Sequence, residues 1–436
     1  MNDDMKQELY DAVHYAMDAL TAGGADGVTI SASRGQRDEL NVEAGVFSLL
    51  RTTFSAGLGF RALLGGRSGV SSANQLDRAA IDQAVAFALD AARASEPDAG
   101  WAIAESIGDR EFTYGTDEGD LDKLYDRCQE VLTEVKTQFP RIDISRIIAS
   151  FSARAAYYVN SNGTRVRQTS ASYGISVSFC ARDGAKVSAL NGYGYSAENL
   201  DAPILENAEL RRLLAETERQ LDPVPVQGKF VGKVLMCPDA ASGFINSALS
   251  NCVSDGALIM GTSPWKDKIG ETVADKRLNI TINSLDERIV FGSKLTSDGF
   301  LAEPQEIIRD GELVSFALGL YGSRKTGLPR AKNDGSLIIG AGGTSYDDLL
   351  AGIEDGLLLN RFSGGGVAQN GEFSGVAKNS FLIKNGKIAD AVSETMISGN
   401  VLDMLNNIAG ISSDLLCDGS SVSPWFVFDG VTISGK

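Results

Sequence analysis

The chain has 436 residues, more than a single hydrophobic core usually serves, so we expect two domains. Acidic residues outnumber basic ones by 57 to 40, and the net charge of −17 disfavours binding to nucleic acid and to anionic membranes. One histidine in the whole chain excludes a zinc hydrolase site built from two or three histidines.

Cysteine usage, hydropathy and the N-terminus indicate a cytoplasmic protein. The five cysteines are scattered and include no Cys-x-x-Cys pair, so neither a disulfide framework nor a zinc knuckle is expected. No apolar run approaches the roughly 20 residues of a membrane span. Residues 1–4 lack the basic and apolar regions of a signal peptide. We therefore expect a cytoplasmic location and no membrane contact.

The first half of the chain mixes helices with strands. Apolar spacings of three and four predict helices over residues 3–22, 77–94, 121–138 and 203–220. Strand patterns occur over Val28–Ser33, Glu39–Leu50, Ala56–Leu64, Ala155–Val159, Thr164–Ser170 and Tyr173–Ala181. The dipeptides Asn162-Gly163 and Asp183-Gly184 predict hairpin turns.

The second half is richer in glycine and short strands. Pro223 and Pro225 mark the expected boundary between domains 1–222 and 223–436. Hairpins are expected at Asp310-Gly311 and Asn385-Gly386, short strands at 278–282 and 337–339, and helices only near 240–249, 346–352 and 401–408. We predict an α+β protein, with an N-terminal α/β-layered domain followed by a mainly antiparallel, sandwich-like or barrel-like β domain with a few helices.

The first half offers little catalytic chemistry. His14 lies beside the apolar stripe of the first predicted helix with no partner nearby in the sequence, so we expect a surface or half-buried role. A Ser-His-Asp or Cys-His pair would have to use it, and no Gly-x-Ser-x-Gly elbow presents a serine. The tract Gly65-Gly66-Arg67 lacks the following Lys-Ser/Thr pair of a phosphate loop. Carboxylate pairs stay open, because 57 acidic residues always offer candidates.

Short motifs along nearly the whole chain occur in an order typical of one family. From Val234 to Asn251 the sequence reads VLMCPDAASGFINSALSN, and from Glu394 to Leu405 it reads ETMISGNVLDML. Further matches are Gly57-x-Gly59-Phe60-Arg61, Gly69–Asn74, Asn160–Gly163, Asp347–Leu350, Gly356–Leu359 and Gly371–Gly375. Together these motifs resemble the TldD/TldE (PmbA) family, once described as modulators of DNA gyrase.

The resemblance implies a two-subunit metallopeptidase. In such a pair, the TldD-type subunit carries a His-Glu-x-x-x-His motif early in its second domain and a later cysteine ligand for zinc. The TldE or PmbA type has the fold without these ligands. The pair encloses a chamber and degrades or trims unfolded peptides, with roles in peptide maturation and antitoxin removal.

An alignment places this chain with the TldE type. Gly261-Thr262-Ser263 matches a Gly-Thr-Ser that follows the TldD motif, so the motif positions fall on Asn246, Ser247 and Asn251. Asparagine cannot replace imidazole as a zinc ligand of useful strength, and serine cannot act as the general base. The chain is therefore expected to have no catalytic residues, to bind no metal and to depend on a TldD-like partner for zinc.

Cys417 is a candidate relic of the family's cysteine ligand, because Cys417–Val422 resembles the segment that bears it. A thiol without function is the simpler interpretation, since a single cysteine is a weak signal and would not hold zinc alone.

Three functions stay open. The leading one is a non-catalytic TldE-like subunit that pairs with a TldD-like subunit and helps to grip unfolded peptide. The second is a stand-alone homodimer that binds peptides or proteins without cutting them. The third is an independent enzyme that uses carboxylates, Cys252 or Cys417, and it predicts a lowered thiol pKa or a close acid pair. The substrate-binding residues are not assigned.

Overall fold

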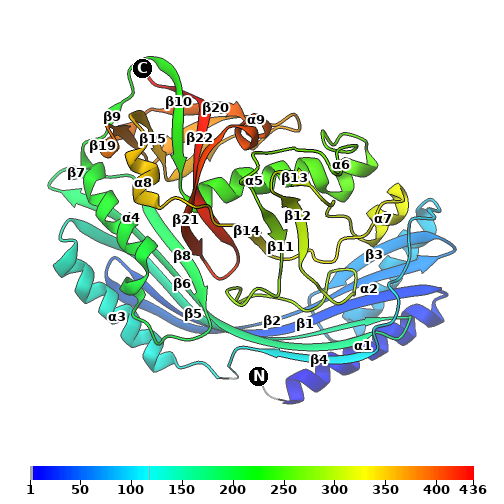
Figure 1. Ribbon diagram of the computed structural model, residues 1–436. Coiled ribbons are helices and arrows are strands. Elements are labelled where there is room, and N and C mark those ends of the chain that lie inside the picture. Colours follow the sequence, from blue (N-terminus) through cyan, green and yellow to red (C-terminus); the bar gives the residue numbers. More distant parts are fainter. Residues whose placement is uncertain (1–2, 117) are drawn as a thin grey trace.

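The computed structural model describes residues 3–116 and 118–436, whose strands form two sheets (Figure 1). The first half contributes an eight-stranded sheet of order β3-β2-β1-β5-β6-β4, in which β7 and β8 also pair with β6. All its pairs are antiparallel except β4 with β6. Its strands are β1 (Gly27–Glu43), β2 (Val46–Leu64), β3 (Arg67–Ala73), β4 (Asp109–Tyr114), β5 (Ile142–Asn160), β6 (Arg165–Asp183), β7 (Lys186–Val187) and β8 (Asn191–Ala197).

The predicted helices of the first half are confirmed. They are α1 (Asp3–Ala22), α2 (Arg78–Ala94), α3 (Leu121–Gln138) and α4 (Ala208–Glu218), the last flanked by 3₁₀ turns at Ile204–Glu206 and Arg219–Leu221. Asp77 and Asp120 cap α2 and α3, because each side chain accepts a hydrogen bond from a backbone N–H of the first turn. The helices α1 and α3 lie on the convex side of the curved sheet, and the second half of the chain lies over its concave side (Figure 1).

The first hairpin differs from the prediction. The expected strand over 39–50 is wrong, because the chain turns at Ala44 and Gly45, whose φ angles are +48° and +78°. β1 therefore ends at Glu43 and pairs directly with Val46 of β2. A left-handed alanine is uncommon, so the sequence carries only a weak turn signal here. The hairpins at Asn162-Gly163, Asp183-Gly184, Asp310-Gly311 and Asn385-Gly386 are confirmed.

The second half forms a mixed sheet of 14 strands. Its pairs are antiparallel except β10 with β15, β14 with β22 and β9 with β19. The strands are β9 (Val224–Pro225), β10 (Lys229–Met236), β11 (Ile280–Ile282), β12 (Gln305–Arg309), β13 (Glu312–Leu313), β14 (Leu337–Ile339), β15 (Asp355–Leu359), β16 (Arg361–Gly364), β17 (Glu372–Lys378), β18 (Phe381–Lys384), β19 (Lys387–Ser393), β20 (Met396–Asn400), β21 (Ile408–Cys417) and β22 (Val422–Ser434). The α+β prediction is confirmed, whereas the domain boundary at 222–223 stays a prediction.

Five helices of the described residues accompany this sheet: α5 (Pro238–Val253), α6 (Asp255–Ile259), α7 (Leu320–Thr326), α8 (Tyr346–Ala351) and α9 (Val401–Asn406). α5 is longer at both ends than predicted, and it begins with proline in its first turn, where a missing N–H does no harm. α6 and α7 were not predicted, because so few residues show no periodicity. No helix in the described part of the chain is long and apolar enough to cross a bilayer.

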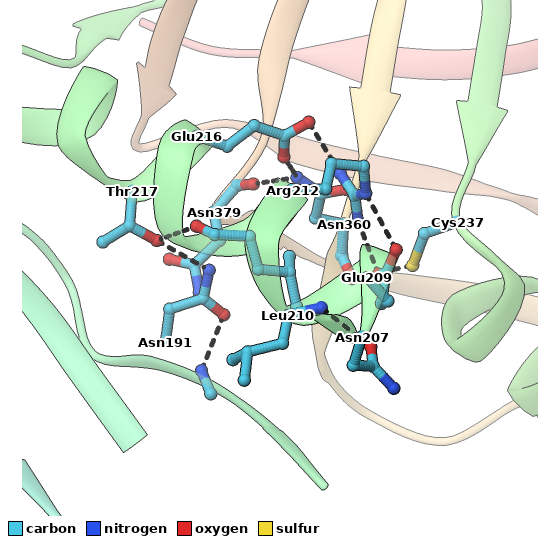
Figure 2. Close-up of polar contacts among 12 residues, drawn as sticks. Asn191, Asn207, Glu209, Leu210, Arg212, Glu216, Thr217, Cys237, Asn360 and Asn379 are labelled. Carbon is cyan, nitrogen blue, oxygen red and sulfur yellow. Dashed lines mark hydrogen bonds and ion pairs between the residues drawn. The ribbon is translucent and has the colours of Figure 1, made fainter. Parts of the chain in front are cut away.

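A buried ion-pair network joins α4 to the second sheet (Figure 2). Arg212 donates two hydrogen bonds to Glu209, at 2.9 and 2.6 Å, and one to Glu216 at 2.6 Å. Asn360 accepts from Arg212 at 3.2 Å and donates to Glu216 at 2.6 Å. The guanidinium carbon lies 4.6 Å from the ring centroid of Trp425. Burial by itself would lower the pKa of Arg212, but the two carboxylates raise it above its ordinary value.

A second contact holds the two halves together near α7. Asp98 accepts hydrogen bonds from the Tyr321 hydroxyl at 2.8 Å and from the Lys325 ammonium at 3.0 Å. Trp101 stacks on Tyr321 with ring centroids 4.0 Å apart. The guanidinium carbon of Arg61 lies 4.5 Å from the centroid of the Trp101 ring. A backbone N–H, Lys325 and Tyr321 together lower the pKa of Asp98 to about 2. The two halves are thus fixed to one another at both ends.

The Arg212 network yields a stability prediction. Arg212→Ala leaves Glu209 and Glu216 buried without a counter-ion, so we expect the free energy of unfolding to fall by about 3–5 kcal/mol in urea denaturation. The neighbouring Arg211 is exposed and is the matched control, for which Arg211→Ala should cost at most about 0.5 kcal/mol. Equal losses of unfolding free energy for the two variants would contradict the proposed contribution of the network to stability.

Candidate functional site

A cavity of about 750 Å³ lies where the two halves of the chain meet. β8 and α4 line one side, and the start of α5 together with β16 lines the other. Its charged lining residues are Glu209, Asp239 and Arg361. Its apolar lining residues include Leu190, Leu213, Phe244, Phe362 and Val367. The cavity therefore combines charged groups with apolar walls, as small-ligand sites commonly do.

Asp239 supplies the free carboxyl of this cavity. It stands in the first turn of α5, directly after Pro238, and its side chain is open to the cavity. Within residues 3–116 and 118–436 it has no hydrogen-bond or ion-pair partner. Asp239 is exposed to solvent through the cavity, but the protein around it partly desolvates the carboxyl and raises its pKa to about 6; the charges of Glu209 and Asp418 add to this increase, and Arg212 opposes it.

The other polar groups around Asp239 are differently engaged. Glu209 is tied to Arg212, so it does not form a free acid pair with Asp239. The Cys237 thiol donates to the Asn360 carbonyl at 3.0 Å, and burial raises its pKa to about 12. One carboxylate oxygen of Asp418 accepts from backbone N–H groups of its own loop. The arrangement thus leaves one carboxyl free to meet a ligand and lacks an acid–base pair.

Tyr193 also lines the cavity, and its side chain is 5% exposed. Its buried hydroxyl lies near the Asn207 side chain but has no properly formed hydrogen bond among the described residues. Burial raises the pKa of this hydroxyl above its ordinary value, and the charges of Asp239, Glu209 and Asp418 add to the effect. A buried hydroxyl without a partner is costly unless a ligand or water completes it.

Two further hollows continue from the cavity along the concave face of the first sheet. A hollow of about 480 Å³ shares Ser176 and Gly194 with the cavity. It shares Ser152, Ser172 and Phe291 with a third hollow of about 930 Å³. Together they form a groove between the two halves of the chain, floored mainly by serine, glycine and alanine, whose small side chains leave the sheet open to a bulky ligand.

The three predicted motif positions lie on α5 but have different surroundings. Asn246 is exposed. Ser247 lines the cavity, and its hydroxyl donates to the Gly243 carbonyl one turn earlier at 2.8 Å. Asn251 donates to the Ala368 carbonyl at 2.9 Å, which anchors the loop between β16 and β17 to α5. These side chains do not fit zinc, since one is a serine, one amide is engaged by the backbone and none is a strong ligand.

Cys417 lies at the end of β21, and its thiol donates to the Arg288 carbonyl at 3.2 Å. Partial burial raises the pKa of this thiol above its ordinary value. Cys252 is fully buried, and burial raises its pKa to about 12. The lowered thiol pKa expected for a cysteine enzyme is therefore wrong for both residues, because neither has a cation close enough to outweigh desolvation.

His14 does not line the cavity and stays on the surface of α1, with its Nε2 atom 3.4 Å from the Tyr157 hydroxyl. The described residues contain no group of three His, Cys, Asp or Glu side chains that could hold a metal ion. Sequence reasoning missed Tyr193, Glu209 and Asp239, which come from three separate elements. Of these residues, only Asp239 stands in a recognisable local sequence pattern, because it follows a proline at the start of a predicted helix.

Comparisons with known proteins agree with the fold. The family model described as PmbA/TldA metallopeptidase domain 1 matches residues 28–92, and the PmbA/TldA metallopeptidase C-terminal domain matches residues 228–435. The chain is 26% identical over 452 residues to the metalloprotease PmbA homolog of Haemophilus influenzae, covering 99% of this chain and 97% of the relative. It is 25% identical over 425 residues to metalloprotease PmbA of Escherichia coli O157:H7, covering 93% and 92%.

Solved structures share the architecture. TldE from Thermococcus kodakarensis superposes with a TM-score of 0.82 at 18% identity, covering 97% of this chain and 100% of that one. A protein from Bacteroides thetaiotaomicron, described as a modulator of DNA gyrase, superposes with a TM-score of 0.82 at 22% identity and covers both chains fully. Together with the two family models, these likenesses extend over both sheets, and the chain therefore belongs to the TldD/TldE (PmbA) metallopeptidase family.

Proposed function

We propose that this chain is the non-catalytic, TldE/PmbA-like subunit of a two-subunit metallopeptidase that degrades or trims unfolded peptides in the cytoplasm. The observation that carries the proposal is the family match over nearly the whole chain. It is combined with the alignment that assigns Asn246, Ser247 and Asn251 to the metal-motif positions. A TldD-like partner would supply the zinc. The name metalloprotease belongs to the relatives, and this chain holds no comparable ligand set at those positions.

The hydrogen bonds of Asn251 support this role. A metal ligand must keep its donor atom free, whereas this amide is engaged by the Ala368 carbonyl, and Gln369 bonds back to the Asn251 carbonyl at 3.3 Å. The residue that the alignment assigns to a ligand position thus fixes a loop that borders the cavity. Loss of catalysis and retention of a shaped cavity together favour a subunit that positions peptide.

The groove suits an extended peptide. Its three hollows follow the concave face of the first sheet, and small residues such as Ser152, Ser172 and Gly194 leave room for a backbone to approach. Extended chains bind proteins mainly through backbone hydrogen bonds, which do not depend on their sequence. We infer that unfolded peptide is held here while the partner cuts it.

An exposed sheet edge supports pairing with a second subunit. Residues 46–57 of β2 pair with β1 only, because β3 begins to pair with β2 at Leu58. Among the described residues no strand covers this edge. Leu50 and Phe54 on it are 64% and 63% exposed. A long apolar edge strand readily pairs with another chain, so we infer that a subunit of the same fold docks there.

The same edge also suits a second copy of this chain. A stand-alone homodimer that binds peptides without cutting them is therefore the alternative function. The two are distinguished by the partner, since the homodimer predicts self-association and no stable complex with a TldD-like subunit. The thiol enzyme is disfavoured by the raised pKa values of Cys252 and Cys417.

The proposal predicts activity only in the complex. The purified chain should cleave no unstructured fluorogenic peptide, and the complex obtained by co-expression with a TldD-like subunit should cleave it. Chelator should abolish that cleavage and added zinc should restore it. Chelator-resistant hydrolysis of the peptide by the purified chain alone would contradict the proposal.

Partner docking on β2 predicts a charge-sensitive edge. Phe54→Lys should weaken co-purification with the partner at least tenfold, because it places a charge in an apolar contact. Phe87 on α2 is 59% exposed and lies away from this edge, so Phe87→Lys is the matched control and should have no effect. Equal loss of pairing in both variants would argue against docking at β2.

The role assigned to Asn251 predicts a local change in dynamics. Asn251→Ala removes the hydrogen bond to Ala368, so amide hydrogen exchange should speed up in residues 365–371 and stay unchanged in the core of α5. Ser250→Ala, on the exposed neighbouring position, should leave the loop unaffected. Unchanged exchange in Asn251→Ala would mean that the loop does not depend on this anchor.

A further inference from the structure

We propose that the groove between the two halves of the chain binds a carboxylate of an extended peptide at Arg154, on the concave face of the first sheet. The inference rests on the peptide-binding role proposed for the groove. It adds a preference for a negative charge at one place along the groove, which backbone contacts alone would not provide. The carboxylate belongs to an acidic side chain or to the C-terminus of the peptide, and the experiment below separates these two sources.

Arg154 lies in the second half of β5, on the face of the strand that looks into the groove. It lines the hollow of about 930 Å³ together with Ser152, two positions earlier, and with residues of the loop 291–297 from the second half of the chain. Its direct neighbours Ala153 and Ala155 pack into the cores on the helix-covered side of the sheet. Because side chains alternate between the two faces of a strand, the side chain of Arg154 extends into the groove.

The guanidinium group of Arg154 has no counter-charge in the described chain. On the two neighbouring strands it stands opposite Gly35 of β1 and Ser170 of β6, and neither residue is charged. Within residues 3–116 and 118–436, Arg154 forms no hydrogen bond and no ion pair. Among the described residues that line this hollow it is the only charged one, and it is exposed to the solvent of the groove. A ligand that enters the hollow therefore meets one free positive charge.

The charges on the adjacent part of the concave face are also mainly positive. Arg37 of β1 stands opposite Ser152, so it is a diagonal neighbour of Arg154, about 7–8 Å away across the sheet. Arg37 and Arg51 both pair with Glu39, at 3.2 and 2.9 Å. Three guanidinium groups thus accompany one carboxylate, in a chain whose net charge is −17. A cleft lined by charges of one sign attracts ligands of the opposite sign.

Hydroxyl groups beside Arg154 can complete the binding of a carboxylate. Ser152 and Ser170 line the same hollow, and within the described chain their hydroxyls form no hydrogen bond. Each hydroxyl can donate to a carboxylate oxygen that approaches the guanidinium. The hollow of about 480 Å³ contains one acidic residue of the described chain, Asp418, which accepts hydrogen bonds from its own loop instead of pairing with an arginine.

This arrangement suits the carboxylate of a peptide better than a phosphate group. A guanidinium presents a planar pair of N–H donors, which matches the two oxygens of a carboxylate. Phosphate sites commonly add the backbone N–H groups of a helix N-terminus, whereas Arg154 lies within a continuous strand. A nucleic acid would bring many phosphates toward a chain of net charge −17. Phe291 on the opposite wall is 56% exposed and offers apolar contact to the remainder of a peptide.

The test measures the binding of peptides of five residues to the full chain by calorimetry at pH 7.5. Three peptides have blocked ends and differ only in a central glutamate, glutamine or lysine. A fourth has the central glutamine and a free C-terminal carboxylate. We expect at least one of the two peptides with a carboxylate to bind about tenfold more tightly than the blocked glutamine peptide, because it gains a charged hydrogen bond. Tighter binding of the glutamate peptide assigns the site to a side chain, and tighter binding of the fourth peptide assigns it to the chain end.

Substitution of Arg154 should remove this preference. Arg154→Gln should make the affinities of the carboxylate and neutral peptides equal, and Arg154→Lys should keep only part of the preference, because an ammonium lacks the planar pair of donors. Added salt should weaken the preference and leave the affinity of the blocked glutamine peptide unchanged. Arg141 is exposed, directly precedes β5 and lines none of the three hollows, so Arg141→Gln is the matched control and should preserve the preference.

Thermal denaturation checks that the variants fold. Arg154 is exposed and has no partner among the described residues, so Arg154→Gln should not change the midpoint of unfolding. A loss of the preference in a folded variant then reports on the site itself. If Arg154→Gln unfolds, Arg154→Lys and the salt dependence of the unmodified chain decide the question.

Four results would contradict the inference. Equal affinity for carboxylate and neutral peptides would remove the carboxylate site and leave the peptide groove intact. A preference that survives in Arg154→Gln would place the site elsewhere. Tight binding of a single-stranded oligonucleotide that depends on Arg154 would make nucleic acid the ligand. The absence of all peptide binding would contradict both this site and the groove, whereas failure to form a TldD-like complex, with peptide binding unchanged, would contradict the subunit role alone.

Discussion

The clamping of Arg212 between Glu209 and Glu216 is the interaction on which the arrangement of the two halves depends. All three residues lie on α4, but the network is completed by Asn360 from the strand side of the second half. The network is buried, so removing any member leaves an uncompensated charge or amide. Its directional hydrogen bonds act together with those of Asp98 to fix how the two halves meet.

This constraint also shapes the cavity. Glu209 and Asn360 face it from the network, and Cys237 bonds to the Asn360 carbonyl at the entrance to α5. Because Glu209 is committed to Arg212, it cannot share a proton with Asp239. Asp239 therefore keeps a carboxyl without a hydrogen-bond or ion-pair partner in the described chain.

Local chemistry made most of the elements predictable. The amphipathic helices carry their own periodicity, and Asn-Gly or Asp-Gly dipeptides mark the hairpins because they adopt positive φ angles. The turn at Ala44-Gly45 was missed, because alanine carries no such preference. The short helices α6 and α7 have too few residues to show a period. These failures occur where tertiary contacts, rather than local preference, determine the backbone.

The cavity was beyond prediction for a different reason. Tyr193, Glu209, Asp239 and Phe362 are far apart in the sequence, and only the packing of two sheets brings them together. The motif positions on α5 could be located from the family resemblance, but their new surroundings could not. The anchoring of a loop by Asn251 requires the position of Ala368, which no pattern near either residue encodes.

Under the proposed function, the two ends of α5 would have separate structural roles. Near its C-terminus, Asn251, which the alignment assigns to a motif position, holds the loop that borders the cavity. At its N-terminus, Asp239 presents a carboxyl that nothing in the described chain neutralises. A helix released from metal binding is free to become regular, because ligands five residues apart point about 140° away from one another on an undistorted helix. The helix from Pro238 to Val253 is continuous, so it fixes the distance between the loop anchor Asn251 and the carboxyl of Asp239.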